Sequence, residues 1–74
     1  MDLGTKRLLV NFLKGNSVTP HNVFEIGGSP SLVRERVEKL RENGWPVEEE
    51  KRSAGKAYWI EREFLKKVGS VPNI

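Results

Sequence analysis

Apolar residues near the start of the chain recur at helical spacing and predict a first helix over about residues 5–14. The residues that share this spacing are Leu8, Leu9, Phe12 and Leu13. Thr5 stands at the position of an N-cap, and Gly15 follows the last periodic residue, where glycine often ends a helix. Beyond a short connection, Val18 is expected to begin a strand with a single bridge.

A threonine followed by a proline, Thr19-Pro20, predicts the start of a short second helix. Proline suits the first helical position, because the N–H that it lacks would have no partner there. The apolar residues expected to supply the contacts of this helix are Val23, Phe24 and Ile26. Gly27-Gly28 are expected to end it.

The same pattern at Ser29-Pro30 predicts a longer third helix, which runs to about Asn43. One narrow apolar stripe, with intervals of four and three residues, consists of Val33, Val37 and Leu40. Gly44 follows as the expected stop.

In the second part of the chain the apolar period changes from helical to extended. Residues 45–51 and 57–60 predict two strands, and residues 52–56, which are small or basic, predict the turn between them. Residues 61–68 predict a short final helix, and residues 69–74 a loose tail.

Together these elements predict one α+β domain over residues 1–74, ordered over about residues 4–68. A three-helix core precedes a two-stranded antiparallel hairpin, and the short helix follows. The residues expected to share a single core are Leu9, Phe12, Val23, Val33, Val37, Leu40, Val47, Tyr58 and Ile60. Trp59 points to the other strand face, where it is expected either to cover the final helix near Phe64 or to be exposed for a partner.

Composition excludes several classes of protein. Without cysteine the chain has no disulfide, no thiolate nucleophile and no thiolate metal ligand. No segment approaches the roughly 18 apolar residues that span a bilayer, and the first residues do not follow the pattern of a secretory signal, so we expect a cytoplasmic protein. His21 stands alone and Gly55-Lys56 lacks the rest of a P-loop, so we expect neither an enzyme, nor a metal, nor a cofactor.

Charge is distributed unevenly along the chain, whose net charge is +3. Basic residues gather in residues 34–41, 51–56 and 66–67, whereas acidic residues cluster at Glu48–Glu50. Separated basic clusters are compatible with a cationic stripe that faces phosphates. A solvated surface of mixed charge is the plainer alternative.

The second and third predicted helices are joined by a short turn that contains glycine, which is the pattern of a helix-turn-helix. In that motif the recognition helix, here residues 30–43, enters the major groove of DNA with its N-terminal part. The polar residues of this helix and its cap that are candidates for DNA contact are Ser29, Ser31, Arg34, Glu35, Arg36 and Lys39. Arg34 is the first choice for a base contact, with guanine as its best partner.

Several of these residues also have a structural interpretation. Arg34 and Glu38 are spaced for an ion pair along the helix. Arg36 lies beside the apolar stripe, where its stem would cover Trp45 or its guanidinium would touch a phosphate. Glu35 and Glu38 would repel phosphates unless they accept from cytosine amino groups or orient the neighbouring cations.

The predicted hairpin offers a second contact, a wing over residues 51–57. Lys51, Arg52 and Lys56 flank small residues at the turn. Small residues let the backbone approach DNA closely, and the cations attract phosphates, so the wing is expected on the DNA backbone or in the minor groove.

The segment from Gly28 to Gly44 resembles the recognition-helix block of the winged helix-turn-helix family, in particular the operator-binding domain of the biotin-operon repressor and small phage-type winged helices. Val47, Gly55-Lys56 and Tyr58 stand where that pattern places a strand, a small turn and an aromatic strand. The resemblance covers about residues 5–60, and Pro30 replaces a longer polar or basic residue. The resemblance implies DNA binding. It does not extend to the biotin-ligase portion of that repressor, so it implies no ligase activity.

The expected function is therefore sequence-specific binding of duplex DNA, as in a small transcriptional regulator. A protein-interaction adaptor on the same scaffold and an architectural DNA factor of a mobile element are the alternatives. One winged helix contacts few base pairs, so weak self-association or partner docking is expected at Trp59, Phe64 and Leu65.

Overall fold

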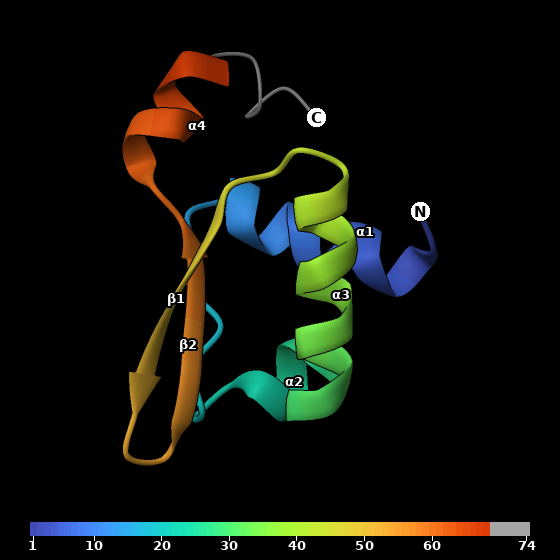
Figure 1. The fold of residues 1–74 in the computed structure, drawn as a ribbon, viewed down its shortest axis with the longest axis vertical. Coiled ribbons are helices and arrows are strands. Elements are labelled where there is room, and N and C mark those ends of the chain that lie inside the picture. Colours follow the sequence, from blue (N-terminus) through green and yellow to red (C-terminus); the bar gives the residue numbers. More distant parts are fainter. Residues whose placement is uncertain (69–74) are drawn as a thin grey trace.

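A computed structural model describes residues 1–68, which form an α+β arrangement of helices and one antiparallel hairpin (Figure 1). In chain order the elements are α1 (Leu3–Leu13), α2 (Val23–Gly27), α3 (Pro30–Glu42), β1 (Val47–Arg52), β2 (Gly55–Ile60) and α4 (Arg62–Val68). The predicted α+β class is confirmed, and the tail predicted for residues 69–74 lies outside the described residues. None of the described helices is long and apolar enough to cross a membrane.

Asp2, and not Thr5, caps α1. Its carboxylate oxygen Oδ1 accepts a hydrogen bond of 2.7 Å from the backbone N–H of Thr5. Thr5 is buried within the helix, so the predicted cap was wrong: an equally good capping residue stands three positions earlier. The predicted end of the helix is confirmed, because Gly15 has a φ of 88°, a conformation that favours glycine.

Asp2 also ties α1 to α3, since its Oδ2 lies 3.0 Å from Nζ of Lys39. The Thr5 N–H and the Lys39 ammonium together hold the pKa of the Asp2 carboxyl well below its usual range. A carboxyl whose pKa is lowered by folding stabilises the folded state above its unfolded pKa of about 4. That contribution is lost as the pH falls through the lower pKa of the folded state.

We therefore expect Asp2→Asn to lower the midpoint of thermal unfolding slightly at neutral pH and progressively less below about pH 4. Asparagine keeps the capping acceptor but not the charge. The effect is small because the side chains of Asp2 and Lys39 are both about half exposed, so that solvent screens the pair. Circular dichroism of both proteins from about pH 7 to about pH 2 measures this, and a pH-independent difference would contradict it.

A turn precedes α2, which begins later than predicted. The side chain of Asn22 accepts from the backbone N–H of Thr19 at 2.7 Å, and the backbone N–H of Asn22 donates to the Thr19 carbonyl at 3.1 Å. These bonds close residues 19–22 into a turn that contains Pro20, so the helix starts only at Val23. Its end at Gly28, with a φ of 89°, confirms the predicted glycine stop.

The boundaries of α3 agree with the local signals. Ser29 is its N-cap, and the side-chain oxygen Oγ accepts a hydrogen bond of 3.2 Å from the backbone N–H of Leu32. Pro30 occupies the first helical turn, and Gly44 takes a φ of 89° beyond the last one. The apolar stripe is buried as predicted, with Val33, Val37 and Leu40 all within the core.

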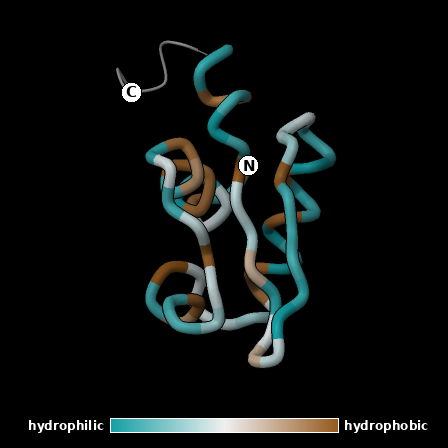
Figure 2. The backbone as a smooth tube through the Cα atoms, turned by 90° about the vertical axis from the view of Figure 1, so that its left-hand side faces the viewer, coloured by the Kyte–Doolittle hydropathy of each residue, from teal (hydrophilic) through white to brown (hydrophobic). Residues whose placement is uncertain are grey.

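The hairpin is tighter than predicted. β1 and β2 pair from Val47–Ile60 down to Arg52–Gly55, so only Ser53 and Ala54 form the connection. The single bridge expected at Val18 is confirmed, because the backbone N–H groups of Val18 and Tyr58 each donate to the other's carbonyl at 2.8 Å. β2 is therefore flanked on both sides, whereas β1 forms the hydrophilic edge of the hairpin (Figure 2).

The core agrees with the prediction except at a few positions. Its buried residues are Leu8, Phe12, Val18, Val23, Val33, Val37, Leu40, Val47, Tyr58 and Ile60. Leu8 occupies the place predicted for Leu9, which is only partly buried against the cluster. Phe24 was wrongly expected to contact the core: 67% of the residue is exposed, because α2 turns only Val23 and Ile26 inward.

Aromatic packing attaches α4 to the rest of the chain. The rings of Trp45 and Phe64 meet edge to face with centroids 6.0 Å apart. Trp59 was expected at this position, but its indole N–H donates to Glu61 at 3.1 Å. Phe64 and Leu65 are partly buried against the core, which weakens the reason for expecting a partner at this surface.

Candidate nucleic-acid interface

One end of the molecule brings together the three segments that sequence analysis associated with DNA. The hairpin turn, α2 and the first turn of α3 all lie at this end, whereas α4 lies at the opposite end (Figure 1). We call it the hairpin end. Its position follows from local geometry, since the tight turn at Gly28 places the start of α3 directly beside α2.

A groove of about 260 Å³ opens at the hairpin end between these elements. Its walls are Pro20, Val23, Phe24, Pro30, Ser31, Arg34, Ala54, Gly55, Lys56 and Tyr58. Of the predicted contact residues it brings together Ser31 and Arg34 from α3 with Lys56 from the hairpin. The groove is thus apolar in its walls and bordered by two cations from different elements.

Arg34 is exposed on the groove wall. The ion pair with Glu38 that the spacing suggested is not formed; Glu38 instead lies 3.6 Å from Nη1 of Arg41. Among the residues that the structure describes, none forms an ion pair with Arg34. Its guanidinium is therefore open to an external acceptor.

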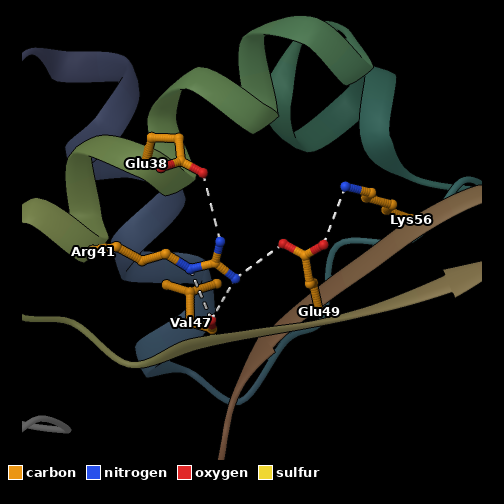
Figure 3. A network of polar contacts seen from close by, with 5 residues as sticks. All are labelled: Glu38, Arg41, Val47, Glu49 and Lys56. Carbon is orange, nitrogen blue, oxygen red and sulfur yellow. Dashed lines mark hydrogen bonds and ion pairs between the residues drawn. The ribbon is translucent and has the colours of Figure 1, made fainter.

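A residue that sequence analysis did not single out, Arg41, fixes the hairpin against α3. Its Nε and Nη2 donate to the Val47 carbonyl at 3.1 and 2.8 Å, and Nη2 also lies 3.1 Å from the Glu49 carboxylate (Figure 3). Lys56 approaches the other oxygen of that carboxylate at 3.1 Å. The ammonium of Lys56 and the guanidinium of Arg41 lower the pKa of Glu49, which stays ionised and holds Lys56 beside the groove.

The cations of the predicted wing differ in their surroundings. Lys56 faces Glu49, and Nε of Arg52 lies 2.7 Å from the Glu50 carboxylate. Lys51 forms no ion pair within the described part of the chain. All three remain exposed, so a phosphate would compete with glutamates for two of them.

Arg36 and Lys39 are engaged within the fold. Nη1 of Arg36 donates to the Gly27 carbonyl at 2.9 Å, so this arginine closes the end of α2. Lys39 pairs with Asp2. Both lie on the flank of α3 that faces the other helices, which explains why the structure places them outside the groove.

Acidic residues line the outer face of α3 beyond its first turn. Glu35, Glu38 and Glu42 are exposed at intervals of three and four residues and therefore share one face. Glu42, which the sequence-based candidates did not include, extends Glu35 and Glu38 into a stripe. A phosphate would be repelled by this stripe, so the start of α3 is the part of the helix better suited to a polyanion.

The chain matches no family model, and no curated protein or solved structure is significantly similar to it. What the hairpin end does must therefore be inferred from its own geometry and charge. Among residues 1–68, no group of three or more histidine, aspartate or glutamate side chains is arranged to hold an ion.

Proposed function

We propose that this chain is a winged helix-turn-helix domain that binds duplex DNA through its hairpin end. The observation that carries the proposal is the convergence of the first turn of α3, α2 and the hairpin on one groove bordered by Arg34 and Lys56. The order of the elements, with Val18 bridged to the hairpin, supports the winged-helix assignment. Sequence-specific binding of this kind suits a small transcriptional regulator.

In the proposed complex, α3 contacts the base edges and the hairpin contacts the DNA backbone. Ser31 and Arg34 stand near the start of α3 and enter the major groove in the proposed complex, where arginine donates to O6 and N7 of guanine. Lys56 and Lys51 stand on the hairpin and meet phosphates. The acidic stripe of α3 keeps the rest of the helix away from the DNA, so the domain approaches the duplex with its end.

Replacing Lys56 with alanine is expected to weaken binding to all duplex sequences by a similar factor. A cation that neutralises one phosphate contributes about 0.9 to the slope of log affinity against log salt concentration, so we expect the slope to fall by about one unit at most. Fluorescence anisotropy with random-sequence duplex DNA at several salt concentrations measures it. Lys66→Ala, on α4 at the opposite end, is the matched control and should leave the slope unchanged.

A protein-interaction adaptor is the second candidate, and the acidic stripe of Glu35, Glu38 and Glu42 is the observation that favours it. A helix face of this charge suits a basic protein partner. The two functions differ in their response to Glu38→Gln: the charge change should strengthen DNA binding slightly by removing repulsion, whereas it should weaken an adaptor.

A further inference from the structure

Phe24 of α2 is an exposed aromatic residue in the wall of the groove at the hairpin end. It is 67% exposed, the most exposed large apolar residue of the described chain, although α2 buries Val23 and partly buries Ile26 beside it. Single apolar residues on a surface are common. Phe24, however, is one wall of the groove at the hairpin end, with Pro20 and Pro30 also in that wall.

The groove combines this apolar surface with positive charge. Arg34 and Lys56 border it, so its occupant should be an anion that also presents an apolar group. Duplex DNA has that combination in its major groove: phosphates run along both edges, and each thymine projects a 5-methyl group from the floor. Aromatic and small apolar side chains contact that methyl in known modes of direct readout.

We infer that Phe24 is a specificity residue that contacts the 5-methyl group of a thymine next to the base that Arg34 reads. The inference rests on the proposed function, because the first turn of α3 must enter the major groove for Phe24 to reach it. Gly28 sets the tight turn between α2 and α3, so Phe24 and Arg34 are presented together. Recognition would then use side chains from both helices of the motif.

Removal of a single methyl group tests the inference. Duplexes recovered by the wild-type chain from a random-sequence pool are resynthesised with deoxyuridine in place of one thymine at a time. Wild type should bind one of these duplexes about fourfold more weakly, as expected for the loss of one buried methyl contact. Phe24→Ala should bind the thymine and uracil forms of that duplex equally, and Phe24→Leu should recover part of the preference.

Val10→Ala is the control, because Val10 is an exposed apolar residue on α1, outside the groove, and its variant should keep the wild-type preference. If wild type binds all thymine and uracil forms alike, or if Phe24→Ala keeps the preference, the inference is overturned while salt-dependent DNA binding stands. A selection that recovers no preferred sequence also overturns it. Absence of any binding to duplex DNA would instead remove the proposed function itself.

Discussion

Replacing Phe12 with alanine is expected to lower the free energy of unfolding by about 3–5 kcal/mol. Phe12 is fully buried in the cluster that joins α1 to α3 and the hairpin, so truncation leaves a cavity that its neighbours fill only in part. Chains of 74 residues rarely have a stability much larger than this loss. The variant should therefore be largely unfolded at room temperature, as measured by circular dichroism during a urea titration.

Phe24→Ala is the matched control for this experiment, because it removes the same atoms from an exposed site. Its free energy of unfolding should change by no more than about 0.5 kcal/mol. Equal losses in the two variants would contradict the exposure of Phe24. A Phe12→Ala protein as stable as wild type would contradict the core.

Replacing Arg34 with alanine is expected to weaken binding to the preferred duplex by about 1–3 kcal/mol, or roughly 5-fold to 150-fold. The exposed Arg34 side chain has no ion-pair partner within residues 1–68 and stands near the start of α3, where its planar guanidinium can make a bidentate contact with guanine. Discrimination at one base pair should be lost together with the affinity. Competition binding against duplexes that differ at single positions measures both.

One further variant separates charge from base readout at this position, and a variant on α4 is its control. Arg34→Lys keeps the positive charge but not the planar pair of donors, so it should keep the salt dependence and lose the discrimination. Arg62→Ala removes an arginine from α4, at the opposite end of the molecule, and should bind as wild type does. An Arg34→Ala protein that still discriminates among base pairs would exclude Arg34 from base recognition.

Local signals explain why α3 was predicted well. Its serine cap, its proline in the first turn and the glycine beyond its end act within a few residues, so the sequence alone carries the information. α2 was predicted less well because five residues contain little more than one helical turn, too few to decide whether Phe24 faces inward. The side chain of Asn22, which moves the start of α2, also offers a competing turn.

Long-range contacts explain the errors within the candidate site. Lys39 is 37 positions away from the carboxylate that it pairs with, and Arg36 reaches a carbonyl at the end of another helix. The spacing along the helix predicts that Arg36 lies beside the apolar stripe and that Lys39 is polar, but it carries no information on which flank of α3 meets another element. Arg41 was overlooked for the same reason, since Val47 and Glu49, to which it donates across the fold, lie on β1.

Chemical-shift mapping of the isotopically labelled chain with duplex DNA tests the central proposal most directly. Backbone amides of α2, of the first turn of α3 and of the hairpin turn around Ala54 should shift together, and the shifts should shrink as salt is added. Amides of α4 and of the acidic stripe should stay unchanged. Shifts confined to α4, with the hairpin end silent, would contradict DNA binding at this end and favour the protein adaptor.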